Sequence, residues 1–592
     1  MKLPLRLGVD LRNARQPVFV NPDGLSRHLH LVGQTGTGKT TSIQTLLRRL
    51  LCEPRKKCCL FVIEPMGNLS FDLLRWISSR KCPQHVRDRL VYIEPAREDV
   101  VMPFNPLRFT TEGNRYYQTA RAVDLILRAW TAQDLSQQPR LAQWAYKAMC
   151  AMALLDLPIA MSRYLLHPGT EEHKAILRRM PDEITFHWSE ILNAKGNEAV
   201  RILESTRNRF DIFYEAPPAR RMFGTFESRF NCERFIREKK IVIINTAKLG
   251  RIPTHLGNTI GSLFANEIFE TAYNMATLHG KSSVDLTYLL MDEFQRFVSP
   301  DIEDAIPTCR QMGLRLILAH QSFSQLRRGE IDLRSMVWQA ANRLMFANSF
   351  EDADIIANEL ATLTFDPMAV KDQRTSLKQL IVGYRREWLR TQGATRTEAE
   401  SVIDQRSVGF SRNESESRPV QRAQGTLSAG TSHSDGHLTG GTRALSSSDS
   451  LGEHEVNVPI HETIEEIASK IFTSFEEHRL EWMKIIRQLK TGICFGRFAD
   501  DDQLYEIMVD YAPVTANPRT DARMQDLIER NFEQDMFISA SEADRLSEED
   551  RRRLLTPPRI VIRPDRPQPG SDESDSNDSD SDGPFRKPRR KP

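Results

Sequence analysis

The sequence of 592 residues predicts an α/β fold with a mostly parallel sheet, interrupted by an inserted all-α domain. Short apolar runs alternate with stretches of helical periodicity within residues 1–110 and again within 236–392, which is the pattern of strands joined by crossover helices. From 111 to 235, apolar residues recur only at helical spacing. We therefore expect one sheet built from two halves of the chain, with the helical domain between them.

Each expected element follows from its local pattern. Apolar, β-prone runs predict strands, and apolar residues at every third or fourth position predict helices. The strands expected in the two halves are Leu5–Val9, Pro17–Asn21, His28–Val32, Cys59–Glu64, Leu90–Ile93, Lys240–Asn245, Leu286–Glu293, Leu314–Gln321 and Asn342–Ala347. The helices expected are Thr41–Leu51, Tyr116–Trp130, Leu141–Leu155, Ala199–Phe213 and Ile260–Met275.

The last third of the chain changes character twice. Residues 393–455 are rich in Ser, Gly, Thr, Arg and Glu, which predicts a mostly disordered insertion. A helix over His461–Leu489 and two edge strands, Gly492–Gly496 and Tyr505–Val509, should then complete the core within 456–515. Residues 516–592 form an extension that ends in an acidic and then basic tail, which we expect to be solvated and disordered.

A glycine-rich motif of the form G-x-x-x-x-G-K-T lies between the strand His28–Val32 and the helix Thr41–Leu51. This is the phosphate-binding loop of P-loop proteins, in which backbone N–H groups and a helix N-terminus surround a phosphate. The lysine should reach the β- and γ-phosphates, and the hydroxyl of Thr40 should bind Mg²⁺. The expected nucleotide-binding residues are Gly33, Gln34, Thr35, Gly36, Thr37, Gly38, Lys39, Thr40 and Thr41.

A second group of candidate residues follows two later strands. Asp292 and Glu293 end an apolar strand, which is the Walker B pattern, so Asp292 should bind the Mg²⁺ and Glu293 should act as the general base. Gln321 ends the next strand, where it either senses the γ-phosphate or bonds a loop. Arg310 either is a solvated surface residue or acts as an arginine finger in a neighbouring subunit, with Arg315 as the next candidate.

These motifs together resemble the HerA/FtsK superfamily, and within it the conjugative type IV secretion coupling ATPases. The resemblance rests on Gly33–Thr40 and Met291–Phe294 and on four other stretches, which are Glu64–Gly67, Phe104–Leu107, Arg310–Arg315 and His320–Ser322. It implies a RecA-like core that assembles as a hexameric ring and moves DNA without reading its sequence, with ATP and Mg²⁺ as cofactors. By the same resemblance, Lys39, Glu293, Arg310 and Gln321 are catalytic.

Two departures from the family bear on the function. The chain has no run of eighteen apolar residues, whereas coupling proteins commonly begin with a membrane anchor, and Glu64 stands where the family often has aspartate. We expect a cytoplasmic protein, with recruitment to the inner face of the membrane by a partner as an alternative. A relaxase or secretion apparatus is one expected partner. The alternatives are a soluble HerA-like helicase working with a nuclease in repair or defence, and a nucleotide-switched scaffold with slow hydrolysis.

Composition excludes other classes. The 81 basic and 79 acidic side chains nearly cancel, so a nucleic-acid surface must be local rather than global. The eight cysteines form no C-x-x-C pair, which argues against a zinc site or a disulfide framework and fits a reduced, intracellular protein.

Overall fold

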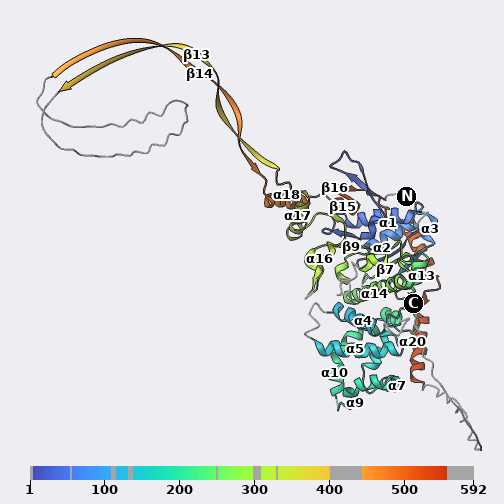
Figure 1. Ribbon diagram of the computed structural model, residues 1–592. Helices are drawn as coiled ribbons and strands as arrows, with labels where there is room; N and C mark the ends of the chain where they lie inside the picture. Colours follow the sequence, from blue (N-terminus) through green and yellow to red (C-terminus); the bar gives the residue numbers. More distant parts are fainter. Residues whose placement is uncertain are drawn as a thin grey trace, which may run out of the picture. The chain divides into compact units, whose positions relative to one another are not determined.

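The computed structural model describes residues 5–53, 57–108, 115–130, 138–195, 197–247, 251–297, 308–328, 331–400 and 443–556 (Figure 1). The chain divides into two compact units. The first contains everything before Phe365 and after Glu477, and the second is Phe365–Glu477. All the candidate site residues belong to the first unit.

One sheet of eleven strands forms the centre of the first unit, in the order β2-β1-β16-β15-β12-β3-β9-β8-β4-β7-β5. Strands β3, β4, β7, β8 and β9 are buried along their whole length, as expected for parallel strands covered on both faces. The strands are β1 (Leu5–Asp10), β2 (Pro17–Val20), β3 (Leu29–Val32), β4 (Cys59–Glu64), β5 (Leu90–Ile93), β7 (Ile241–Asn245), β8 (Thr287–Met291), β9 (Leu314–His320), β12 (Asn342–Met345), β15 (Ile493–Phe498) and β16 (Asp501–Val509).

The sheet has a parallel and an antiparallel part. Strands β12, β3, β9, β8, β4, β7 and β5 run parallel to one another. β15 pairs antiparallel with β12 and β16, and β16 with β1. The expectation that β15 and β16 are edge strands is therefore wrong: the N-terminal hairpin β1–β2 adds outside them, because the register Gly8↔Val509 extends the same ladder. The outermost strands are β2 and β5.

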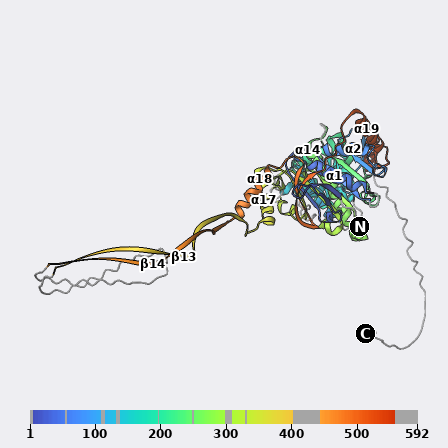
Figure 2. The same cartoon turned by 90° about the horizontal axis from the view of Figure 1, so that it is seen from above.

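Helices cover both faces of the sheet. α1 (Lys39–Cys52), α2 (Asn68–Ser78) and α19 (Pro518–Phe532) pack on one face, and Figure 2 shows α19 beside α2. α13 (Cys232–Arg237) and the long α14 (Thr254–His279) lie against β4 on the other. Successive residues of a strand point to opposite faces, so Leu60 and Val62 join the core of the α1 face whereas Phe61 is buried on the α14 side. Other helices of the core are α3 (Gln84–Arg87), α16 (Arg334–Val337) and α17 (Phe350–Thr364).

Every secondary-structure element described between residues 115 and 223 is a helix, which confirms the expected all-α character of the inserted segment. Its first helix contacts α14, where Arg121 pairs with Glu270. Trp144 and Trp188 pack edge to face in its interior. The helices are α4 (Arg115–Trp130), α5 (Pro139–Leu154), α6 (Ser162–Leu165), α7 (Glu171–Arg179), α8 (Asp182–His187), α9 (Ser189–Asn193), α10 (Glu198–Phe210), α11 (Ile212–Glu215) and α12 (Pro217–Phe223).

The described part of the C-terminal extension is ordered by contacts with the core. Asn531 of α19 exchanges hydrogen bonds of 2.8 Å with the backbone N–H and C=O of Tyr92 in β5. α20 (Ala540–Leu555) follows, and its Asp544 pairs with Arg221 of α12 at 2.9 Å. Two short strands, β6 (Val100–Val101) and β17 (Ile538–Ser539), join these segments. The predicted disordered tail after residue 556 lies outside the described residues.

The second unit is a long antiparallel ribbon of two strands, β13 (Val370–Glu400) and β14 (Arg443–Phe472). The structure corrects two predictions here. Residues 393–400 and 443–455 of the expected disordered insertion are strand, and only 401–442 lie outside the described residues. The expected helix His461–Leu489 is strand up to Phe472 and helix only in α18 (Phe475–Arg487), because pairing with β13 overrides the helical spacing of the isoleucines. In the described part of the chain, no helix combines the length and apolarity that crossing a bilayer demands.

Candidate functional site

The phosphate-binding loop connects the end of β3, at Val32, to the start of α1, at Lys39. Gly36 and Gly38 have φ angles of 80° and 112°, a left-handed region that residues with a Cβ rarely adopt. Gly38 is the N-cap of α1, and no side chain caps this helix end. The first-turn N–H groups of α1, including those of Thr40 and Thr41, therefore remain available to an anion.

The nine expected nucleotide-binding residues lie on one continuous surface. Gln34, Thr35 and Gly36 are exposed, and Thr37, Gly38, Thr40 and Thr41 are half-buried, whereas Gly33 and Lys39 are buried. Two segments distant in the sequence form backbone hydrogen bonds with the loop. The N–H of Gln34 donates to the carbonyl of Ala347 after β12 at 2.9 Å, and the N–H of Gly492 before β15 donates to the carbonyl of Thr37 at 2.9 Å.

Lys39 is only 6% exposed, and its ammonium donates to the carbonyls of Gly33 and of Gln34, the latter at 3.2 Å. Burial lowers the pKa of Lys39, and the negative charges of Glu293 and Asp292 oppose this shift. The lysine of the loop therefore shares one electrostatic environment with the two acids, as the sequence motifs predict.

Both Walker B acids lie at the carboxyl end of β8, on the same edge of the sheet as the loop. The N–H of Asp292 donates to the carbonyl of Ile63 in β4 at 3.1 Å, which extends the ladder by one residue. Glu293 then turns away with a φ of 52°, and η6 (Phe294–Phe297) begins directly after it. Backbone strain of this kind in a residue with a side chain is concentrated at functional sites.

The carboxylate of Glu293 is held between two amides. The Nε2 atom of Gln321, which follows β9, donates to Oε1 of Glu293 at 2.6 Å. The Nε2 atom of Gln295, in η6, donates to Oε2 at 2.6 Å and also to Oε1 of Gln325 at 3.0 Å. Glu293 is 7% exposed, so the two amides fix the orientation of a buried carboxylate.

Asp292 lies among other carboxylates. Burial raises its pKa to about 7, and the adjacent charges of Glu293 and Glu64 add to the shift. Glu64, at the end of β4, is fully buried and accepts hydrogen bonds from the hydroxyl of Ser70 at 2.9 Å and from the N–H of Met66 at 2.9 Å. Asp292 thus lies near the carboxylates of Glu293 and Glu64, and this group of buried acids fits a divalent cation bound by Asp292 and the hydroxyl of Thr40.

The strand that leads to Gln321 is linked to the strand that leads to the loop. His320 of β9 and His30 of β3 are both completely buried, and their rings stack with Nε2 atoms 2.7 Å apart. Burial lowers the pKa of both imidazoles, that of His320 to about 3. The pair is therefore neutral, with one ring donating to the other, and it couples the two strands that end at the phosphate-binding loop and at Gln321.

Arg310 lies far from this site in its own subunit. It is exposed and belongs to the helical turn before β9, whereas Gln321 follows the other end of the same strand. Seven strand residues separate the two, a length of about 20 Å. Arg315 is 4% exposed, donates to the hydroxyl of Tyr288 at 2.7 Å and pairs with Asp285 at 2.7 Å. These contacts exclude Arg315 as an alternative finger.

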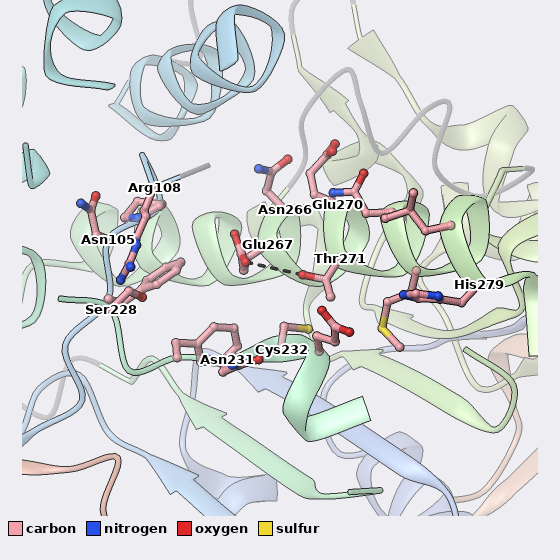
Figure 3. Close-up of a pocket in the computed structure, with 17 residues that line it drawn as sticks. Asn105, Arg108, Ser228, Asn231, Cys232, Asn266, Glu267, Glu270, Thr271 and His279 are labelled. Atoms are coloured by element: carbon pink, nitrogen blue, oxygen red, sulfur yellow. Dashed lines mark hydrogen bonds between the residues drawn. The ribbon is translucent and has the colours of Figure 1, made fainter. Parts of the chain in front are cut away.

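A separate cavity of about 710 Å³ lies along α14 on the other face of the sheet (Figure 3). Its lining includes Asn105 of the Phe104–Leu107 motif, Cys232 and Glu267. Figure 3 shows the Glu267 side chain turned toward Thr271, whose hydroxyl donates to it at 3.5 Å. Burial raises the pKa of Glu267 to about 7. None of the expected site residues lines this cavity.

Sequence reasoning missed three contributors to the phosphate site: Gln295, Gly492 and the His30–His320 pair. Gln295 follows Glu293 by two residues, but an amide at that spacing has no recognisable pattern. Gly492 reaches the loop from 450 residues away, through the sheet order that places β15 near β3. Contacts of this range depend on topology and leave no signal in the local sequence.

Two segments of the chain match known protein families. Residues 5–131, which contain the phosphate-binding loop, match the family model of the central domain of the helicase HerA. Residues 287–406, which contain Asp292, Glu293, Arg310 and Gln321, match the TraM recognition site of TraD and TraG. Over these two segments, which together make up less than half of its length, the chain is similar to HerA and to TraD and TraG.

The chain is also similar to solved structures. The bacterial conjugative coupling protein TrwBdeltaN70 is 14% identical over 87% of this chain and 92% of its own, with a TM-score of 0.46. The plasmid coupling protein TrwB in complex with ADP and Mg²⁺ is 15% identical over 61% of this chain and 78% of its own, with a TM-score of 0.41. VirB4 of Thermoanaerobacter pseudethanolicus is 15% identical over 61% and 88%, with a TM-score of 0.33. No curated protein matches the chain.

Proposed function

We propose that this chain hydrolyses ATP to move DNA through a hexameric ring, as a motor of the conjugative type IV secretion coupling kind. The observation that carries the proposal is the carboxylate of Glu293, held by Gln321 and Gln295 on the sheet edge that bears Lys39. A protein that only binds nucleotide has no need of an oriented general base. The expected DNA contact is independent of sequence, and a relaxase or secretion apparatus at the inner face of the membrane is the expected partner.

The residues divide the chemistry of hydrolysis among themselves. The N–H groups of the loop and of the first turn of α1 bind the phosphate oxygens, and Lys39 neutralises charge on the β- and γ-phosphates. Thr40 and Asp292 would hold Mg²⁺, which would offset the negative charge of the phosphates. Glu293 accepts the proton of the water that attacks the γ-phosphorus, while the bond from that phosphorus to the bridging oxygen breaks.

β9 offers a physical route from one active site to the next. Gln321 at its carboxyl end contacts the general base of the same subunit. Arg310, about 20 Å away at the other end, is exposed. In a ring it would stabilise charge in the transition state of a neighbouring subunit. A shift of this rigid strand when the γ-phosphate leaves would therefore move Arg310 at the adjacent active site. Sequential hydrolysis around a ring requires coupling of this kind.

The test is movement along DNA. The full chain, with ATP and Mg²⁺, is added to single-stranded DNA that carries streptavidin on a terminal biotin, and to duplex DNA that carries a triplex strand. We expect ATP-dependent displacement from at least one substrate and none with Glu293→Gln. ATP turnover without displacement from either substrate would contradict translocation and leave the scaffold function.

A second function within the same fold is a helicase that acts with a nuclease. The match of residues 5–131 to the HerA central domain favours it. The distinguishing observation is the partner: co-purification with a nuclease favours the HerA-like function, and co-purification with a relaxase favours the coupling function.

A further inference from the structure

The ribbon β13–β14 is a two-stranded element with large apolar side chains on its surface. Among the strand residues whose side chains the structure describes, eight exposed apolar residues lie on β13 and six on β14. Leu377 is 71% exposed, Tyr384 65% and Trp388 68%. An isolated two-stranded ribbon is marginally stable in water at best, and one of about 100 Å has two long open edges. The exposed apolar side chains and the open strand edges therefore favour contact with a partner.

The apolar side chains are on both faces of the ribbon. Leu377 pairs across with Glu465 and Leu380 with Glu462. Since successive strand residues alternate between faces, Leu377 and Leu380 point to opposite sides. A lipid surface, or a protein that covers one face, would leave the other face in water. Strands added at the two edges would flank the side chains of both faces at once, because neighbouring strands lie about 5 Å apart.

The two strands carry opposite charge. Over residues 370–390, β13 has six basic and two acidic side chains, a net charge of +4. Over residues 453–472, β14 has one basic and five acidic side chains, a net charge of −4. Within the ribbon these charges already pair, as Arg386 does with Glu455 and Lys378 with Glu466. The edge that β13 presents is thus basic over residues 370–390, and the edge that β14 presents is acidic over residues 453–472.

This asymmetry selects one way of pairing. Two β13 edges would place like charges opposite each other, and so would two β14 edges, which is destabilising. A β14 edge beside the β13 edge of another copy is complementary, and it is antiparallel when both ribbons point the same way. This arrangement uses different surfaces on the two partners, and heterologous contacts of this kind generate rings.

We propose that the ribbons of neighbouring copies pair edge to edge, with β14 of one copy beside β13 of the next, into one continuous antiparallel sheet. The proposal rests on the ring assembly of the proposed function and adds a second interface, outside the nucleotide site, that holds the ring together. Pro459 has no N–H to donate, so a ladder that reaches it lacks that bond. With every ribbon paired on both sides, the sheet has no open edge.

Chemical cross-linking of the full chain tests the pairing. Gln379→Cys places a thiol on β13 and Thr463→Cys places one on β14, at exposed positions that face each other within a ribbon. Seven of the native cysteines are buried and Cys52 is half-buried, so the unmodified chain treated with a short bismaleimide gives the background. We expect cross-linked dimers when the two variants are mixed, and only background from either variant alone.

Each other outcome overturns the proposal. Dimers from Gln379→Cys alone would show that like edges meet. Absence of dimers in a mixture whose mixed oligomers are shown by co-purification of differently tagged chains would show that the ribbon lies outside the interface. A chain that stays monomeric at all concentrations would exclude pairing altogether. ATP binding and turnover are measured on the same samples, so that failure of the ribbon interface is distinguished from failure of the ATPase.

A charge-reversal variant measures how much the charges of the ribbon contribute to assembly. Arg386→Glu with Arg390→Glu reverses two charges on β13 and should raise the concentration needed for assembly about tenfold or more, since each like-charge pair costs up to about 1 kcal/mol. The control is Arg201→Glu, which reverses an exposed charge on α10. Assembly that responds equally to both changes would contradict a role for the ribbon.

Discussion

The side-chain amide of Gln321 donates a 2.6 Å hydrogen bond to the carboxylate of Glu293. The first residue follows β9 and the second follows β8, which are neighbours in the sheet. The contact therefore fixes the general base relative to the strand that carries Arg310 at its other end. Gln321→Ala should leave ATP affinity unchanged and lower kcat about 10- to 100-fold, because the carboxylate loses its orientation.

Two further variants make that measurement specific. Gln295→Ala removes the other amide and should also lower kcat with little effect on KM. Gln311→Ala removes an exposed amide near the opposite end of β9 and is the matched control. A rise in KM with unchanged kcat for Gln321→Ala would show that Gln321 binds substrate and does not position Glu293.

Lys39→Ala and Glu293→Gln should fail in different ways. Lys39→Ala removes the charge that meets the phosphates, so both nucleotide binding and hydrolysis should be lost. Glu293→Gln keeps the shape of the side chain and leaves Asp292 in place, so ATP should bind while turnover falls about 10²- to 10⁴-fold. Nucleotide affinity by fluorescence titration and steady-state turnover separate the two. Normal turnover in Glu293→Gln would exclude it as the base.

Arg310→Ala tests action between subunits. Because Arg310 is exposed and about 20 Å of strand separates it from Gln321, we expect ATP binding to be retained and hydrolysis to fall on the order of 10³-fold. A Glu293→Gln subunit retains Arg310 and can supply it to an Arg310→Ala neighbour. Mixing the two inactive variants should restore part of the activity, and only at concentrations that support assembly.

Two outcomes would contradict that assignment. One is full activity of Arg310→Ala by itself, and the other is an inactive mixture in which mixed oligomers are shown to form. Arg315 is no substitute, since its pairing with Asp285 holds it inside its own subunit.

Glu267 should make stability depend on pH. Burial raises its pKa from 4.5 to about 7, so the folded protein keeps this proton to higher pH than the unfolded chain does. The contribution of the protonated Glu267 carboxyl to stability is therefore complete below about pH 4.5 and is lost as the pH rises through about 7. Between pH 5 and pH 8, Glu267→Gln should increase the free energy of unfolding by about 1–3 kcal/mol relative to the unmodified chain.

Thermal melting at a series of pH values measures this gain. Glu233→Gln alters an exposed carboxylate of the same cavity and is the control. A Glu267→Gln difference that is constant across the range would show that the cavity solvates the charge.

The sequence predicts those features that depend on local pattern. The loop Gly33–Thr40 and the acids Asp292 and Glu293 lie where their motifs place them, since a buried strand and the turn after it are set by neighbouring residues. The ribbon was predicted wrongly because Ile464, Ile467 and Ile471 have helical spacing. Their partners are Lys378, Thr375 and Asp372, about ninety residues away, and pairing of that range has no local signature.

The same reason explains the site residues that reasoning from sequence missed. Gln295 contacts Glu293 only because the turn of η6 brings its side chain to that carboxylate. Gly492 contacts the loop only because β15 lies beside β12 in the sheet. Glu64 is visible as the acid that ends β4, but its effect on Asp292 depends on β4 and β8 being neighbours.

ATP turnover by the full chain, with and without DNA, tests the central claim most directly. It is measured with saturating ATP and Mg²⁺ at a protein concentration that supports assembly, beside Glu293→Gln as the matched control. We predict turnover in the unmodified chain that single- or double-stranded DNA stimulates several-fold, and almost none in the control. Turnover that neither form of DNA changes, or that survives in Glu293→Gln, would contradict the account.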